Sequence, residues 1–125
     1  MIAVGVGASR GCPPHELAAL VDAALIVAGV AAAEVRWLAS ADLKAGEPAV
    51  LALAREHGWP LRTFATHALA AVAVPTPSTT VRRHVGTPSV AEAAALLAAT
   101  PGRLLLTKRR SAHATCAIAE QGRGA

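Results

Sequence analysis

A glycine-rich turn near the amino terminus is the first segment whose residue types could bind a ligand. Residues 5–11 read Gly-Val-Gly-Ala-Ser-Arg-Gly and precede a predicted helix. Free backbone amides and the partial positive charge at a helix amino end, together with Arg10, would suit a carboxylate or a phosphate. The GxGxxxG spacing differs from that of dinucleotide sites, and a plain strand-to-helix turn would not explain an arginine at its tip. We therefore favour anion binding here, by Gly7, Ala8, Ser9, Arg10 and Gly11.

A second polar loop, residues 40–46, follows the next predicted strand. Its Lys44 could pair with an anionic ligand, and Asp42 could orient that ligand or take part in proton transfer. A solvated surface ion pair is an equally good interpretation of these two residues. No other residue has a sequence spacing that indicates a catalytic role.

Another predicted helix amino end, at Gly86 and Thr87, offers a further place for an anion to dock. Thr76 and Ser78 add hydroxyl donors nearby in the sequence. Ser89 and the acidic residue three positions later have the spacing of a capping box, which explains both residue types without any chemistry.

Metal binding and nucleophilic catalysis have no recognisable motif in this sequence. The five histidines are scattered, and Cys12 and Cys116 lie far apart with no Cys-x-x-Cys pair. Ser9, Thr115 and Cys12 lack an adjacent base that the spacing can place. We expect no metal and no cofactor, and the cysteine usage suggests a reducing cytoplasm.

Length and composition limit the class of protein. With 125 residues, 54% of them apolar, the chain fits one domain, expected over residues 1–121, with a loose tail at 122–125. The net charge of +4 favours anionic partners, but an aromatic content of 2% leaves little to stack on nucleic-acid bases. The longest apolar run, residues 17–33, carries Asp22 and is mostly alanine, so we expect neither a membrane span nor a signal peptide.

The candidate residues are positioned by alternating strands and helices. Strands are predicted at residues 2–7, 34–39, 61–65, 103–108 and 113–119, and helices at 13–28, 47–58 and 89–99, with one or two helical turns at 66–71. This order predicts a single layered α/β domain whose mixed, mainly parallel sheet is flanked by helices. The loops at the carboxyl ends of the parallel strands, including residues 7–11 and 40–46, should form the binding crevice.

Five segments in this order resemble the CobE/CbiG carboxy-terminal family of cobalamin (vitamin B12) biosynthesis. They are residues 5–11, 40–48, 74–78 and 86–96, and Lys108 together with residues 114–119. The resemblance covers almost the whole chain. It implies work on corrin-ring intermediates, with other enzymes of the pathway as further partners.

The resemblance also suggests which ligand the cationic residues would bind. Precorrins carry many acetate and propionate arms around an apolar macrocycle. Arg10, Lys44, Lys108 and two helix amino ends could hold those carboxylates, while the ring rests near Gly7 and Ala8. We therefore expect a protein that binds a precorrin and assists its processing or transfer.

Two alternatives remain open. Two-domain relatives resemble a cobalt-precorrin-5A hydrolase, which opens a lactone and releases acetaldehyde. If this chain catalysed such a hydrolysis, Asp42 would be the base and Lys44 would stabilise the oxyanion. This chain looks like the stand-alone form, for which the resemblance implies no settled reaction. Whether it is an enzyme therefore stays open. A nucleic-acid-binding module is the more distant alternative.

Overall fold

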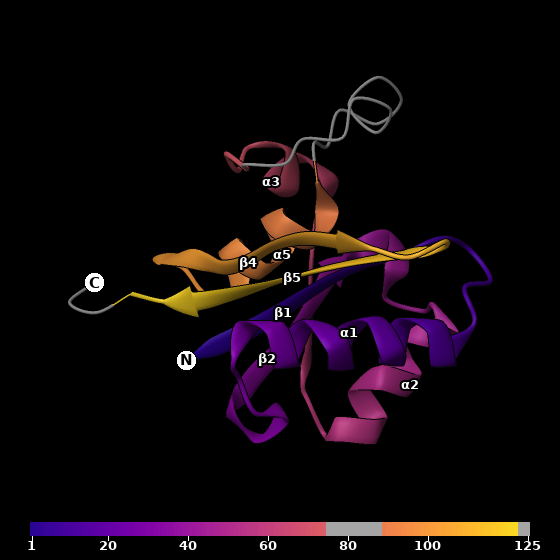
Figure 1. Cartoon of the computed structure of the whole chain (residues 1–125). Helices are drawn as coiled ribbons and strands as arrows, with labels where there is room; N and C mark the ends of the chain where they lie inside the picture. The colour runs from indigo at the N-terminus through magenta and orange to yellow at the C-terminus, as the bar shows by residue number, and fades with distance from the viewer. Residues whose placement is uncertain (75–88, 123–125) are drawn as a thin grey trace.

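The computed structural model describes residues 1–74 and 89–122, and it shows strands and helices alternating over the first half of the chain (Figure 1). The strands are β1 (Ile2–Ala8), β2 (Val35–Ala41), β3 (Leu61–Phe64), β4 (Gly102–Arg110) and β5 (Ala114–Gln121). The helices are α1 (Pro14–Ala28), α2 (Pro48–His57), α3 (Thr66–Ala70) and α5 (Val90–Ala98), with short 3-10 turns η1 (Ala32–Glu34) and η2 (Asp42–Lys44).

The five strands form one mixed sheet in the order β3-β2-β1-β5-β4. β1 pairs in parallel with β2, and β2 with β3, whereas β5 is antiparallel to both β1 and β4. Four strands therefore share one direction and only β5 opposes them, which confirms the predicted mixed, mainly parallel sheet flanked by helices. The carboxyl ends of β1 to β4 and the amino end of β5 consequently meet at one end of the sheet.

Helices cover both faces of this sheet. α1 and α2 lie on one face and α5 and α3 on the other (Figure 1), and a separate apolar cluster fills each side. The helix boundaries follow from the sequence, because α1 and α2 each have proline in the first turn and end at Gly29 and Gly58, both in the left-handed conformation.

The contact between β1 and α5 depends on small residues. A Cβ on Gly5 would lie 2.0 Å from the carbonyl oxygen of Ala91 and 2.7 Å from the amide nitrogen of Ala95. Gly5 belongs to the glycine-rich segment and also to the strand predicted at residues 2–7, and it lies in β1 as predicted. Its lack of a side chain lets the alanine-lined face of α5 approach the sheet backbone.

Several boundaries differ from those predicted, among them the carboxyl ends of β2 and β4. β2 continues through Ser40 and Ala41, so the loop predicted at residues 40–46 begins only at Asp42. Ser40 is fully buried and its Oγ donates to the carbonyl of Val6 at 2.7 Å, which explains why a polar residue belongs to the strand. β4 extends to Arg110, because its pairing with β5 continues to Thr115.

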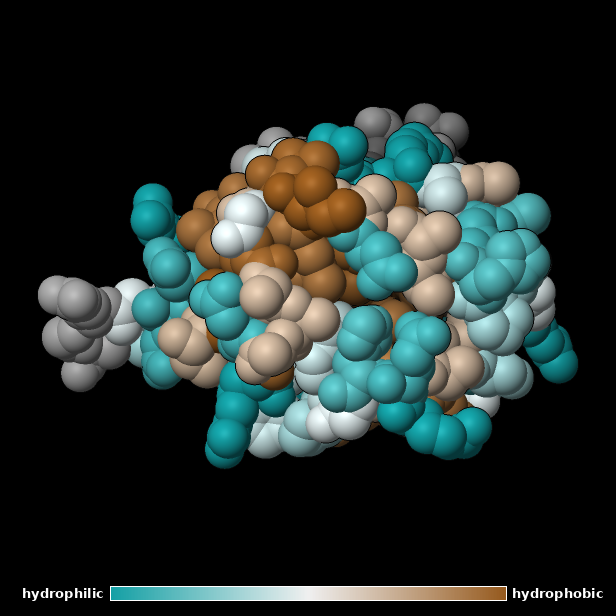
Figure 2. Space-filling view, turned by 60° about the horizontal axis from the view of Figure 1, so that its bottom comes forward, coloured by the Kyte–Doolittle hydropathy of each residue, from teal (hydrophilic) through white to brown (hydrophobic). Residues whose placement is uncertain are grey.

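The surface on the α1 and α2 side is largely hydrophilic but carries one hydrophobic patch (Figure 2). Exposed apolar side chains in this part of the fold include Ile26 and Val27, which are 80% and 55% exposed. Both residues lie at the carboxyl end of α1, which is the opposite end of this helix from Glu16 in the first turn. None of the described helices is long and apolar enough to cross a membrane.

Candidate functional site

A surface pocket of about 250 Å³ opens where the carboxyl ends of β1 and β4 meet the amino end of β5. Its walls are residues 7–9 of β1 and the following turn, Val90 at the start of α5, and residues 110–115 across the β4–β5 turn. The described lining residues include the cation Arg110, His113 and three residues with hydroxyl groups, and none of them is acidic. These groups suit an anionic or hydrogen-bond-accepting ligand.

Gly7 keeps one of the pocket's hydroxyls accessible. A Cβ at this position would lie 2.7 Å from Thr115 Oγ1 on the neighbouring strand. Glycine therefore allows the Thr115 hydroxyl to sit beside β1 without a clash. Two of the sequence-predicted neighbours, Ala8 and Ser9, line the same wall.

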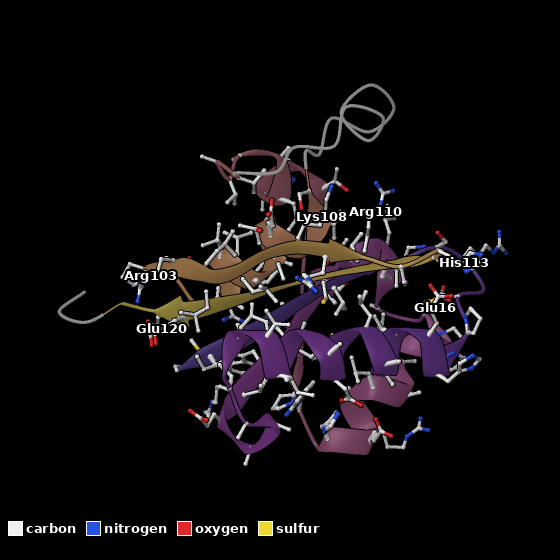
Figure 3. All side chains as sticks on the ribbon, in the orientation of Figure 1. Glu16, Arg103, Lys108, Arg110, His113 and Glu120 are labelled. Atoms are coloured by element: carbon white, nitrogen blue, oxygen red, sulfur yellow. The ribbon has the colours of Figure 1, made fainter. Side chains whose placement is uncertain are left out.

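Glu16, from the first turn of α1, holds the β4–β5 turn in place. Its Oε2 accepts hydrogen bonds from Ser111 Oγ and from the backbone N–H of His113 at 2.6 Å, and its Oε1 lies 2.8 Å from His113 Nδ1. The hydrogen bonds from Ser111 and His113 lower the pKa of Glu16 to about 2, so this carboxylate is ionised at neutral pH. Figure 3 shows Glu16 and His113 together at this end of the molecule, and Arg110 on β4 with its side chain on the opposite side of the sheet from Glu16.

A second glutamate fixes the turn that follows β1. The backbone N–H of Gly11 donates to Glu47 Oε1 at 3.1 Å, and Glu47 is the N-cap residue of α2. The N–H of Ser9 donates to the carbonyl of His113 at 2.8 Å, which links the same turn to the β4–β5 turn. The pocket walls are thus connected by backbone hydrogen bonds.

A third glutamate, Glu92, forms a hydrogen bond on the other face of the sheet. Ser89 caps α5, its Oγ accepting from the backbone N–H of Glu92 at 3.3 Å, as the sequence predicted. Glu92 is fully buried, and its Oε2 accepts from the backbone N–H of Lys108 at 2.8 Å. The capping-box interpretation missed this second role of Glu92, which ties α5 to β4 just before Arg110.

The thiol of Cys12 is a poor nucleophile in this setting. Burial, followed by the charges of Glu16 and Glu47, raises its pKa, so the reactive thiolate is disfavoured. Among the described residues, no three His, Cys, Asp or Glu side chains are grouped so that they could hold a metal ion.

Only some of the predicted site residues line this pocket. Gly7, Ala8 and Ser9 line it, and Arg10 and Gly11 follow directly in the turn. Asp42 and Lys44 form η2 after β2, at the same end of the sheet but outside the pocket lining, and Lys108 precedes Arg110 by two residues on β4. Thr76, Ser78, Gly86 and Thr87 lie outside the described residues. Convergence of Arg10, Lys44 and Lys108 on one ligand stays a prediction.

Among the residues of the site that were not singled out as ligand-binding in the sequence are Arg110, Ser111, His113 and Glu16. Arg110 belongs to the basic run 108–110, which most often indicates a solvated turn. Glu16, Ser111 and His113 have no local signal, because the contacts of Glu16 join residues 95 and 97 positions apart.

The fold and the pocket define a class: a small α/β domain with a cationic, hydroxyl-rich pocket at the carboxyl ends of its parallel strands. The family model described as "Cobalamin synthesis G C-terminus" matches residues 2–119, and the chain belongs to this family.

Two relatives and a solved structure agree with this assignment. The chain is 41% identical to Protein CobE of Sinorhizobium sp over 123 residues, covering 94% of this chain and 79% of that protein. It resembles the crystal structure of CobE, a protein from the cobalamin biosynthetic pathway, with a TM-score of 0.88 and 35% identity over 95% of this chain and 89% of the other. It is also 28% identical to a cobalt-precorrin-5A hydrolase of Priestia megaterium, over 95% of this chain but only 32% of that protein. The chain thus belongs to a cobalamin-biosynthesis family and spans about a third of the hydrolase.

Proposed function

We propose that this protein binds a polycarboxylated corrin or precorrin intermediate at the carboxyl end of its sheet and assists the processing of that intermediate or its transfer to another enzyme of the pathway. The observation that carries the proposal is the pocket itself. It combines Arg110, His113 and three hydroxyl side chains with a lining that contains no acid, in a chain of a cobalamin-synthesis family.

The size of the pocket suggests how such a ligand would bind. A volume of about 250 Å³ is smaller than the roughly 300 to 1,000 Å³ of pockets that enclose whole drug-sized ligands. The pocket would therefore receive one or two acidic arms, while the macrocycle rests outside against neighbouring surface. Arg10, Lys44 and Lys108 would then contact other arms.

Binding energies of ordinary size are sufficient for this arrangement. A hydrogen bond to a charged group contributes about 1.5 to 3 kcal/mol. Three or four of them would support a Kd in the micromolar range, about −8 kcal/mol, after the cost of association.

A titration with uroporphyrin tests the proposal, because this fluorescent tetrapyrrole carries acetate and propionate arms on every pyrrole ring. Arg110→Gln should weaken binding by roughly tenfold or more, the loss of one charge-assisted contact. Arg103→Gln is the matched control, because Arg103 pairs with Glu120 at 3.2 Å and Figure 3 shows this pair at the opposite end of β4. Equal affinity of the two variants, or no binding by the unmodified protein, would contradict the proposal.

A precorrin lactone hydrolase is the second candidate function. The Glu16–His113 pair favours it, because a histidine held by a carboxylate is a common proton acceptor. Asp42 and Lys44 remain the sequence-based alternatives for base and oxyanion stabiliser. Release of acetaldehyde from a purified precorrin, dependent on the protein, would establish this activity.

The same protein preparation can be used to test the third candidate function, nucleic-acid binding. Binding to DNA or RNA that weakens steeply as salt rises would support it, since counterion release dominates such complexes. We expect no such binding, because the described pocket offers no aromatic platform for bases.

A further inference from the structure

The hydrogen bonds of Glu16 determine which nitrogen of His113 carries the proton. Glu16 is ionised at neutral pH and can only accept hydrogen bonds, and its Oε1 lies 2.8 Å from His113 Nδ1. Nδ1 must therefore be the protonated nitrogen. In the neutral ring, Nε2 is then left with a free lone pair.

That ring is available to a ligand. The side chain of His113 is 55% exposed, and His113 and Arg110 are both among the residues that line the pocket. The ring is fixed by its Nδ1 contact and by the backbone N–H of the same residue, which also donates to Glu16. Nε2 is thus an unprotonated atom on a ring of fixed orientation, in a residue that lines the pocket.

Ser111 does not complete a serine-hydrolase triad. Its Oγ donates its proton to Glu16 Oε2, whereas a serine nucleophile must donate to the histidine. The proton that Nε2 could accept would therefore come from water or from the ligand.

We propose that Glu16 and His113 form a proton-transfer pair, in which Glu16 orients the ring and Nε2 of His113 accepts a proton from water or from an acidic group of the tetrapyrrole bound in this pocket. The nature of the ligand rests on the proposed function, whereas the state of the pair does not. In ester or lactone hydrolysis, Nε2 would take a proton as the water oxygen bonds to the carbonyl carbon. It would return that proton to the leaving oxygen as the C–O bond breaks, leaving a carboxylic acid and an alcohol.

Glu16→Gln tests the pair with almost no change of shape. Glu16 Oε2 accepts two donors and Oε1 faces one ring nitrogen. The glutamine carbonyl should keep the two donors, so its NH₂ group would face His113 Nδ1 and donate to it. The ring proton is then forced onto Nε2, which changes from an acceptor to a donor.

Nitrogen-15 NMR of the ligand-free protein reads this difference directly. At a pH where imidazoles are neutral, the unmodified protein should show His113 with a proton on Nδ1, and Glu16→Gln should show it on Nε2. A protonated Nε2 in the unmodified protein, or the same tautomer in both proteins, would overturn the proposal. The tautomer reports the state of the pair, and protection of His113 by uroporphyrin tests whether the pair faces the ligand.

Chemical modification gives an independent measure of the free lone pair. Diethyl pyrocarbonate acylates unprotonated imidazole nitrogens, and peptide mapping reports each histidine separately. Modification of His113 should be at least about tenfold slower in Glu16→Gln, equivalent to about 1.4 kcal/mol. The exposed His15 and His67 provide internal references and should react equally in both proteins. Unchanged modification of His113 would also contradict the pair.

The uroporphyrin titration separates this proposal from the proposed function. If the unmodified protein does not bind uroporphyrin, the proposed function fails, while the tautomer and modification rates of the ligand-free protein still decide the state of the pair. If uroporphyrin binds and shields His113 from the reagent, the pair faces the ligand. If it binds and leaves His113 as reactive as before, the proton-transfer role is excluded.

Discussion

Replacing Gly5 by alanine should force α5 away from the sheet. The added Cβ would lie 2.0 Å from Ala91 O, and at least 3.0 Å is needed, so the helix must shift by about 1 Å. Two of the three nearest atoms belong to the α5 backbone, which no side-chain rotation can relieve. Overpacking usually costs about 1 to 3 kcal/mol. We expect about 3 kcal/mol here, at the upper end of that range.

Urea unfolding measures this cost, and the chain offers a matched control. Gly46→Ala adds the same methyl group where nothing lies within 4 Å, so its stability should change by less than about 1 kcal/mol. For Gly5→Ala we expect the Tm to fall by about 10 °C. Because Val90 at the start of α5 lines the pocket, uroporphyrin affinity should fall as well. A Gly5→Ala protein as stable as Gly46→Ala would refute this account of the β1–α5 contact.

Three further predictions concern the site. Ser89→Ala should lower the free energy of unfolding by about 1 kcal/mol through loss of the cap, with uroporphyrin affinity nearly unchanged. Arg10→Ala and Lys44→Ala should each weaken uroporphyrin binding by about tenfold while leaving the Tm nearly unchanged; equal affinity to the unmodified protein would remove these residues from the site. The pKa of Glu16 is lowered from 4.5 to about 2, so its stabilising contribution is present above pH 4.5 and is lost as the pH falls through 2. The Tm difference between the unmodified protein and Glu16→Gln should therefore shrink over that pH range, and a constant difference would contradict it.

The fold was predictable because its signals are local. Proline in the first turn and glycine at the end define α1, and the short strand predicted at residues 34–39 corresponds to β2. The antiparallel pairing of β4 and β5 follows from the short connection between them. Each of these signals lies within one element or between neighbours along the chain.

The site was less predictable because its contacts join distant residues. Gly7 to Ser9 were identified through the glycine-rich motif and do line the pocket. The role of Gly5, in contrast, depends on a helix that begins 85 positions later, at Val90. A surface-type residue such as Glu16 gives no sign in the sequence that its partners are Ser111 and His113.

The three glutamates around the site bear on which groups can hold a ligand's carboxylates. Glu16 and Glu92 lie in the first turns of α1 and α5, and Glu47 is the N-cap of α2, so each places a carboxyl group at the positive end of a helix. Each also accepts a backbone N–H from a strand or turn at the site. A ligand anion at these helix ends would meet a protein carboxylate that already occupies the favourable position. The side chains that line the pocket, Arg110 above all, are therefore better placed to bind an acidic arm than the helix amino ends that the sequence suggested. Arg110→Gln should therefore weaken uroporphyrin binding more than Ser89→Ala, although Ser89 directly precedes Val90, which also lines the pocket.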